Sequence, residues 1–304
     1  MKAVPYVFFD NRRHFQSWFL QILRVIPDDQ EVFVLSNAAP PIHIARTKNL
    51  KFIQLSDLDY RKKFKNFERS YVHLSTHEPE FELSCFERYF ALEALMTKLN
   101  LDSAWHLDID VLPTQDLERF NEFELVFSSP YPDHSVVSAH TSKFSIGGIR
   151  DLTDFLVRNF YADYLDELRF FFRSRVQRGL SGGVCDMQGL AYWLRTINSD
   201  DWLNSFQNRD VEVHINHTLA NIDVEFAEIN GSKNSKIAFR KGRLEVSSKK
   251  SSRVYATLHF QGQFKFLIPY FLRFRILIGS ARFLLYQTKI ATKLFLLKVR
   301  FLGK

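Results

Sequence analysis

The chain has 304 residues, 46% of them hydrophobic and 25% charged, so it can bury a core of ordinary size in one large domain or two smaller ones. No stretch approaches the roughly 18 uncharged apolar residues of a membrane-spanning helix, and the first residues, MKAVPYVFFDNRR, lack the apolar run of a signal peptide. The only cysteines, Cys85 and Cys185, lie far apart, which argues against a secreted disulfide scaffold and fits a reducing cytosol.

The net charge of +7 is spread unevenly along the chain. From residue 261 to 304 there are nine basic residues and no acidic one, which leaves 32 basic and 34 acidic residues in the remainder. The body is therefore close to neutral. Since nucleic-acid binding usually needs a basic groove in the folded body, no nucleic-acid partner is expected.

Short apolar runs alternate with helical patterns along the first hundred residues. Strands are predicted over 4–9, 31–35 and 50–55, and helices over 14–26 and from a capping box at 84–87 to about residue 99. Alternation of this kind is typical of an α/β fold, with a mostly parallel sheet flanked by helices.

The second half of the chain continues this pattern and then changes. A strand is predicted over 123–127, a polar loop over 133–148, helices over 151–175 and 186–197 with a glycine-rich loop at 181–183 between them, and a hairpin over 236–246. Without a repeat or a low-complexity linker, we expect one domain over 1–263 and an appended tail over 264–304.

Two aspartates lie close together in the stretch AWHLDIDVLPT, which runs from Ala104 to Thr114. Strand alternation puts Asp108 and Asp110 on one face, at the edge where open α/β sheets bind ligands. Carboxylates held so close repel unless a cation lies between them, and such oxygen ligands suit Mg²⁺ or Mn²⁺ shared with substrate phosphates. The pattern predicts a metal–diphosphate site, and a strand-end turn with solvated acids is the alternative.

A second informative stretch, TLHFQGQFK, runs from residue 257 to 265. His259 closes a strand, Gly262 permits close backbone approach, and Lys265 can reach a phosphate. The imidazole could complete a coordination sphere begun by Asp108 and Asp110, although a strand-end histidine has many roles without a metal. The remaining candidates, His134, His140, His214 and His217, show no zinc spacing and are assigned no metal.

The two linked motifs, in this order, resemble the GT-A glycosyltransferases, and most closely the glycogenin and bacterial lipopolysaccharide galactosyltransferase type (glycosyltransferase family 8). The resemblance runs from about residue 4 to 265 and implies a Rossmann-like GT-A fold. It implies that Asp108, Asp110 and His259 hold Mn²⁺ (or Mg²⁺), which binds the diphosphate of a nucleotide-sugar, with a UDP-sugar as the first expectation. It also assigns donor contacts to Asp10, Arg88, Asp108, Gly262 and Lys265.

Some of these assignments have plain structural alternatives. Asp10 could belong to a strand-end turn, and Arg88 could make a surface ion pair. Asp186, Met187 and Gln188 stand where the family has an Asp-Gln pair near the reacting carbon. Asp186 is the candidate base if the reaction inverts that carbon, it orients sugar hydroxyls if the reaction retains it, and a helix cap is the third alternative. Gln188 is the candidate for the amide contact, because methionine cannot supply it.

The tail interleaves basic residues with Phe, Leu, Ile and Tyr. Charges every few residues forbid membrane spanning, yet the apolar content is too high for a solvated arm. Such a composition predicts a basic amphipathic helix that lies in an anionic lipid interface. The alternative is a helix packed on the body with a solvated basic face.

Together these features predict a metal-dependent hexosyltransferase that is peripheral on the cytoplasmic face of the plasma membrane. It would move a hexose from a nucleotide-sugar to a surface glycan or glycolipid, as in lipopolysaccharide or capsule biosynthesis. Two alternatives remain open: a metal-dependent nucleotide-sugar hydrolase or phosphoryl-transfer enzyme, and a catalytically inactive, membrane-bound nucleotide-sugar-binding protein. Turnover that needs an acceptor would favour transfer over hydrolysis, and metal-dependent binding without turnover would favour the inactive protein.

Overall fold

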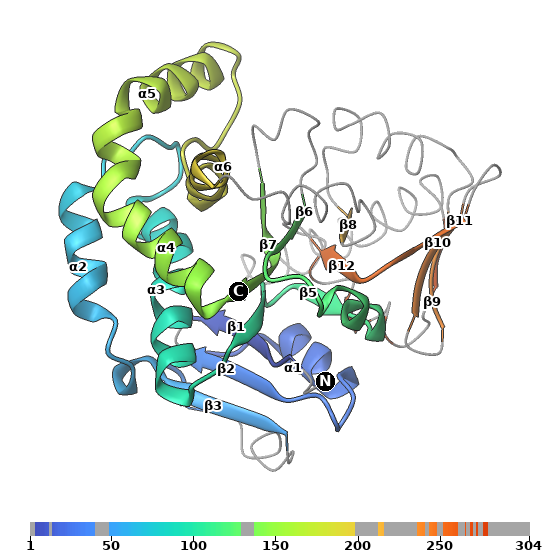
Figure 1. Cartoon of the computed structure of the whole chain (residues 1–304). Helices are drawn as coiled ribbons and strands as arrows, with labels where there is room; N and C mark the ends of the chain where they lie inside the picture. The colour runs from blue at the N-terminus through green and yellow to red at the C-terminus, as the bar shows by residue number, and fades with distance from the viewer. Residues whose placement is uncertain are drawn as a thin grey trace, which may run out of the picture.

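A central sheet packed between layers of helices dominates the computed structural model of the chain (Figure 1). The structure describes residues 4–11, 14–39, 49–128, 137–197, 212–215, 236–240, 243–247, 252–260, 265, 268–269, 272 and 276–278. Within these ranges, no helix combines the length and the apolar character needed to cross a membrane.

The central sheet has six strands in the order β3-β2-β1-β4-β7-β6. They are β1 (Tyr6–Asp10), β2 (Val32–Ser36), β3 (Leu50–Gln54), β4 (Ser103–Leu107), β6 (Val126–Ser128) and β7 (Ser138–Ser145). β1 pairs in parallel with β2 and β4, and β2 pairs in parallel with β3, whereas β7 runs antiparallel to both of its neighbours. The α/β fold with a mostly parallel sheet, predicted from the sequence, is confirmed.

Helices cover both faces of this sheet. They are α1 (Ser17–Val25), α2 (Arg61–Ser70), α3 (Pro79–Leu99), α4 (Ile146–Phe155), α5 (Tyr161–Gln177) and α6 (Asp186–Thr196), with the 3-10 helices η1 (Leu55–Asp57) and η2 (Gln115–Phe120) and the short π-helix η3 (Leu156–Phe160). In Figure 1, α2 to α6 gather on the left of the sheet. Helix α3 begins at Pro79, so the capping box predicted at 84–87 is wrong; a proline in the first turn needs no backbone N–H there.

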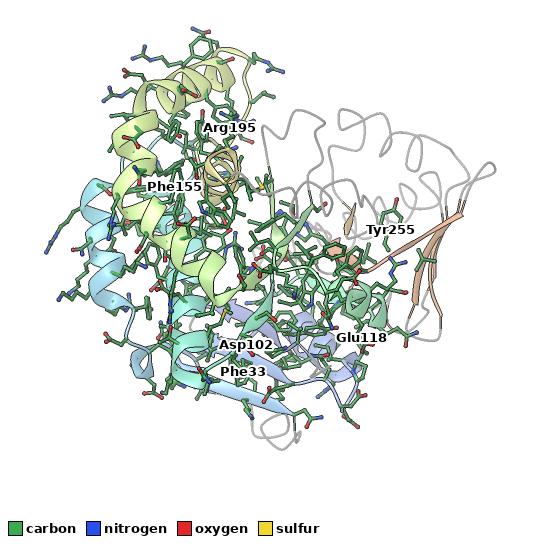
Figure 2. All side chains as sticks on the ribbon, viewed as in Figure 1. Phe33, Asp102, Glu118, Phe155, Arg195 and Tyr255 are labelled. Atoms are coloured by element: carbon green, nitrogen blue, oxygen red, sulfur yellow. The ribbon has the colours of Figure 1, made fainter. Side chains whose placement is uncertain are left out.

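Side-chain alternation along the strands divides the interior into two cores. On β1, Val7 joins the core beneath α2 to α6, whereas Tyr6 and Phe8 join the core beneath α1. Figure 2 labels Phe33 in the first core and Tyr255 in the second. Because both faces are buried, β1 and β2 are nearly continuous apolar runs, and each fully buried large side chain contributes about 1.5–3 kcal/mol.

Two smaller sheets lie beside the central one. One has the order β5-β12-β8, from β5 (Val111–Pro113), β12 (Thr257–Phe260) and β8 (Glu212–Ile215). The other has the order β11-β10-β9-β13, from β11 (Ser252–Tyr255), β10 (Arg243–Ser247), β9 (Lys236–Arg240) and β13 (Ile276–Ile278). The antiparallel pairing of β9 with β10 confirms the predicted hairpin.

Part of the predicted tail belongs to this architecture. Ile268 is buried in the second core, and Ile276–Ile278 pairs with β9 as a strand. The prediction of a helix is therefore wrong for Ile276–Ile278. This apolar run between basic residues forms a strand because it pairs with β9 in a sheet. The tail beyond residue 278 lies outside the described residues, and its helical character stays a prediction.

Strand β7 corrects a second prediction, because a polar loop was expected over 133–148. Its composition is polar, yet Ser138, Thr141, Ser142 and Lys143 are all buried. Lys143 donates hydrogen bonds to main-chain carbonyls near η2, and burial lowers its pKa. Polar side chains with internal partners can therefore occupy a strand between β4 and β6, where hydrophobicity alone gives no strand signal.

Candidate functional site

A cleft of about 700 Å³ opens at the carboxyl ends of β1 and β4. These strands are neighbours in the sheet. From β1 the chain adds strands on one side (β2, β3), and from β4 it adds strands on the other side (β7, β6). Open α/β sheets bind ligands at the point where the strand order reverses in this way. Asp10 enters the cleft from the end of β1, and Asp108 follows the last residue of β4. Helix α3 and the segment that leads into α6 supply the opposite wall.

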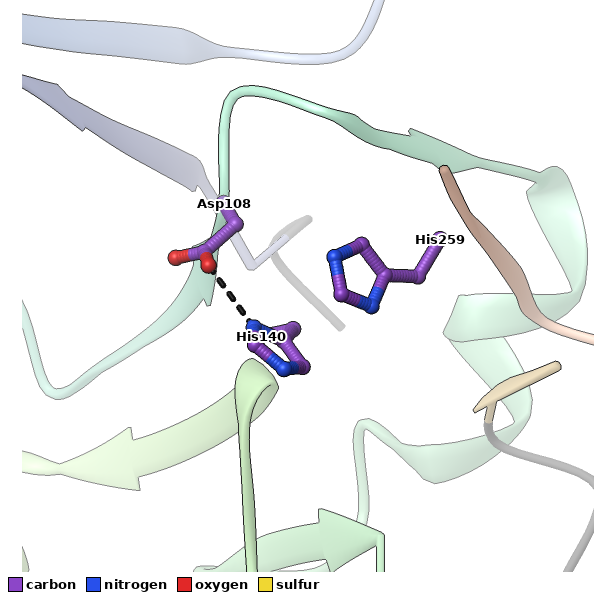
Figure 3. Close-up of side chains that lie close together, drawn as sticks. All are labelled: Asp108, His140 and His259. Atoms are coloured by element: carbon purple, nitrogen blue, oxygen red, sulfur yellow. Dashed lines mark hydrogen bonds and ion pairs between the residues drawn. The ribbon is translucent and has the colours of Figure 1, made fainter. Parts of the chain in front are cut away.

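Asp108, His140 and His259 converge within this cleft (Figure 3). Each offers one ligand atom, and the three atoms lie within 4.8 Å of one another. Asp108 lies in the turn between β4 and β5, where its N–H donates to the carbonyl of His140 at 2.8 Å. The Nδ1 of His140, on β7, is 2.8 Å from the Asp108 carboxylate, and the rings of His140 and His259 are 3.9 Å apart at their centroids. Three elements thus bring a mixed oxygen and nitrogen donor set to one point.

Asp110 lies beside this cluster, between His259 and Lys265. Its carboxylate is 2.8 Å from Nζ of Lys265 and 3.5 Å from Nε2 of His259, and its main-chain carbonyl accepts from the N–H of Phe260 at 3.0 Å. Burial raises the pKa of Asp110, but the charge and hydrogen bond of His259 and the charge of Lys265 outweigh it and lower that pKa to about 2. Asp110 is therefore ionised at neutral pH and holds Lys265 at the cleft.

Arg88 from α3 joins Asp108 to Asp186 at the cleft wall. Its side chain is only 6% exposed, and its guanidinium donates to both carboxylates. Burial alone would raise the pKa of Asp108, but the charge of Arg88 and the hydrogen bond from His140 hold that pKa well below its usual value. The hydroxyl of Tyr89 also donates to Asp186, at 3.1 Å. Arg88 is therefore part of a buried network of ion pairs, and the alternative of a surface ion pair is wrong.

The start of α6 defines the surroundings of the two predicted catalytic residues. Cys185 is the N-cap of α6, so Asp186 is the first residue of the helix and is not its cap. The Oε1 of Gln188 accepts from the N–H of Cys185 at 3.0 Å and thereby completes a capping box. Both Asp186 and Gln188 line the cleft. Their catalytic roles stay predictions, and the bonds of Asp186 to Arg88 and Tyr89 favour an orienting role.

The far rim of the cleft is built from two loops bonded to each other. The N–H of Val184 donates to the carbonyl of Leu74 at 2.8 Å, and the N–H of Gly182 donates to Oγ1 of Thr76 at 2.8 Å. A Cβ on Gly183 would lie 2.1 Å from the carbonyl oxygen of Leu74. The absence of a side chain at this position therefore permits the contact between the loops.

We expect Gly183→Ala to destabilise the protein by about 1–3 kcal/mol, because the backbone of the facing loop has to move. Urea unfolding followed by circular dichroism measures this change. Gly147→Ala is the matched control, since its Cβ would meet only Oγ of Ser145 at 4.0 Å and it lies in the first turn of α4. Equal stability of the Gly183 and Gly147 variants would contradict the close approach.

The structure brings together most of the residues singled out from the sequence. The cleft is lined by Asp10, Arg88, Asp108, Asp110, Asp186, Gln188, His259 and Lys265. Gly262 lies outside the described residues, so its role stays a prediction. His140 was assigned no metal, and its place beside Asp108 arises from the pairing of β4 with β7, of which its spacing in the sequence gives no sign.

No protein-family model matches the sequence, and no curated protein matches it. Among solved structures, the chain is similar to the crystal structure of mouse xyloside xylosyltransferase 1 in its apo form. The identity is 9% and the TM-score 0.42, over 74% of this chain and 92% of that chain. A similarity at this level carries no argument about function, which has to rest on the chemistry of the cleft.

Proposed function

We propose that the cleft is the active site of a metal-dependent glycosyltransferase of GT-A type, related to glycosyltransferase family 8. The observation that carries the proposal is the convergence of Asp108, His140 and His259, whose ligand atoms lie within 4.8 Å of one another beside Asp110 and Lys265. Ionised Asp108 supplies a hard oxygen donor, and two imidazoles suit first-row transition metals better than Mg²⁺. This donor set fits Mn²⁺ and favours it over Mg²⁺.

The surrounding charges fit a substrate that carries a diphosphate. A bound divalent ion would supply Lewis-acid stabilisation to the departing diphosphate. Lys265, held by Asp110, would stabilise negative charge that develops in the transition state. Arg88 keeps Asp108 ionised, and Asp10 lies where the nucleotide would enter at the end of β1. These groups support a nucleotide-sugar donor, with UDP as the first nucleotide to test.

The roles at α6 follow from their contacts. Asp186 is 3% exposed and bonded to Arg88 and Tyr89, an arrangement suited to orienting the hydroxyls of the donor sugar. Gln188 lies one helical turn from the N-cap and lines the same cleft. Because its Oε1 accepts from the N–H of Cys185, its NH₂ is the part of the amide that is available to the reacting sugar. These roles favour a reaction that retains the configuration of the reacting sugar carbon. The alternative is an inverting reaction in which Asp186 acts as the base.

The proposal extends to the acceptor and to location. The excess of basic charge after residue 261, interleaved with aromatic and aliphatic residues, supports attachment to an anionic membrane. A hexosyltransferase at the cytoplasmic face of the plasma membrane would meet a surface glycan or glycolipid acceptor, as lipopolysaccharide or capsule assembly requires.

A thermal-shift panel of UDP-, GDP-, CMP- and dTDP-sugars, each with and without Mn²⁺, tests the donor half of this proposal. Ligand at a hundred times its Kd should stabilise the fold by about 2.7 kcal/mol. We expect one nucleotide class to stabilise the protein only with metal, and Asp108→Ala, which removes the carboxylate of the three-residue donor set, to lose that shift. No metal-dependent shift with any nucleotide would overturn the proposal.

Turnover separates the proposed transferase from the two alternatives. Release of nucleotide that continues undiminished without any acceptor would favour a hydrolase. Metal-dependent binding without turnover, with candidate glycan and glycolipid acceptors supplied, would favour a catalytically inactive binding protein. We expect nucleotide release to require an acceptor.

A further inference from the structure

Glu82 is a buried carboxylate at the rim of the cleft and lacks a partner for one of its oxygens. Its side chain is 1% exposed, and Oε1 accepts from Oγ of Ser75 at 2.6 Å and lies 2.9 Å from Nδ1 of His77. No described residue bonds Oε2. A buried oxygen without a partner costs stability, so such a group in a cleft is suited to a ligand that donates a hydrogen bond.

His77 presents a second polar group at the same place. Its contact with the Glu82 carboxylate, which only accepts, makes Nδ1 the protonated nitrogen in the neutral ring. Nε2 is then an acceptor on the opposite edge of a ring that is half exposed and lines the cleft. A carboxylate oxygen and an imidazole nitrogen together match adjacent hydroxyls of a polyol.

Phe81 adds an apolar surface beside these groups. It lines the cleft, is 55% exposed, and meets the ring of His77 edge-on with 5.4 Å between centroids. A large apolar side chain exposed beside convergent polar groups is typical of a ligand site. The face of an aromatic ring can pack against the C–H groups of a sugar, while the polar groups bond its hydroxyls.

The position of this group along α3 separates it from the proposed donor end. Glu82, Cys85 and Arg88 are spaced three residues apart and all line the cleft, so they follow one face of the helix. The six residues from Glu82 to Arg88 correspond to about 9 Å along the helix axis. The guanidinium of Arg175 lies near Gly182 at this end, and Arg88 and Lys265 lie at the other end. The Glu82 carboxylate only accepts hydrogen bonds, so it suits a hydroxyl, which can donate, and not an ionised diphosphate oxygen, which cannot.

We propose that His77, Phe81 and Glu82 form the acceptor subsite of the cleft and bind a sugar through its hydroxyls and one apolar face. This inference rests on the proposed function and specifies where the transferase would bind its acceptor. Oε2 of Glu82 and Nε2 of His77 accept from two hydroxyls, and Phe81 packs on the ring. The loops around Leu74 and Gly183, which are bonded to each other, adjoin the subsite.

Saturation-transfer-difference NMR with a panel of methyl glycosides of hexoses and hexosamines, in the presence of UDP and of Mg²⁺, which is diamagnetic and does not broaden the ligand signals, tests this subsite. We expect at least one glycoside to bind the wild type. Glu82→Gln and Phe81→Ala should each raise its Kd about tenfold or more, because each removes one direct contact. Phe170→Ala is the matched control, since Phe170 is 74% exposed on α5 and does not line the cleft.

The metal-dependent thermal shift with nucleotides, measured on the same variants, separates the two proposals. An unchanged nucleotide shift with lost glycoside binding supports the acceptor subsite. Absence of glycoside binding to the wild type overturns the subsite and leaves the donor proposal in place if the nucleotide shift persists. An equal effect of Phe81→Ala and Phe170→Ala, or loss of the nucleotide shift in Glu82→Gln, also overturns it.

Discussion

Replacing Arg88 by methionine should lower the free energy of unfolding by about 3–5 kcal/mol. The guanidinium bonds both Asp108 and Asp186, and its removal leaves the buried carboxylate of Asp186 and the partly buried carboxylate of Asp108 without their shared cation. Tyr89 and His140 still bond one carboxylate each, which is too little to neutralise the pair. Urea unfolding at pH 7 without metal measures the loss.

The double variant Arg88→Met with Asp186→Asn tests the cause of this loss. Removing one of the two stranded charges should recover part of the stability, so the two substitutions should not be additive. Arg169→Met is the matched control, because Arg169 pairs with Asp166 while their side chains are 47% and 99% exposed, and exposed pairs contribute at most about 1 kcal/mol. Equal losses in the Arg88 and Arg169 variants would contradict the buried network.

The central sheet could be predicted from the sequence because both of its faces are buried. The strands of β1 and β2 carry apolar residues at almost every position, and their carboxyl ends carry polar residues such as Asp10 and Ser36. Polar residues at these ends predicted the edge at which the cleft opens. Strand β7 could not be found in this way, since its buried side chains include Thr141 and Lys143, whose partners come from distant segments.

The pair of aspartates shows what the local sequence could predict about the site and what it could not. A strand was expected to hold Asp108 and Asp110 on one face, with a cation between them. The structure instead ends β4 at Leu107 and begins β5 at Val111, so the two carboxylates lie in the turn between strands. Each has a cation of its own within the chain, Arg88 for Asp108 and Lys265 for Asp110.

His140 shows which part of a site sequence spacing cannot predict. It lies 32 residues from Asp108 and contributes through the antiparallel pairing of β4 with β7, in which Leu107 faces Thr141. This register places His140 beside the residue that follows β4. Pairing between distant strands depends on the whole fold, whereas the motifs around Asp108 and His259 could be recognised locally.

Replacing His140 by alanine should weaken Mn²⁺ binding by at least tenfold, with a loss of about 1.4 kcal/mol or more. Its Nδ1 already contacts Asp108, and its ring faces His259, so it completes the three-residue donor set. Titration of free Mn²⁺ by electron paramagnetic resonance measures this affinity without a nucleotide. His14→Ala is the matched control, because His14 is exposed and does not line the cleft.

The same titration decides between the two ligand sets. The sequence motifs propose Asp108, Asp110 and His259, whereas the geometry groups Asp108 and His259 with His140. Asp110 is engaged by Lys265 at 2.8 Å, so Asp110→Asn should weaken Mn²⁺ binding less than His140→Ala. If Asp110→Asn abolishes binding while His140→Ala leaves it intact, the ligand set proposed from the sequence is the correct one. Equal losses in both variants would mean that the ion is shared by the two carboxylates and both imidazoles, with Lys265 displaced from Asp110.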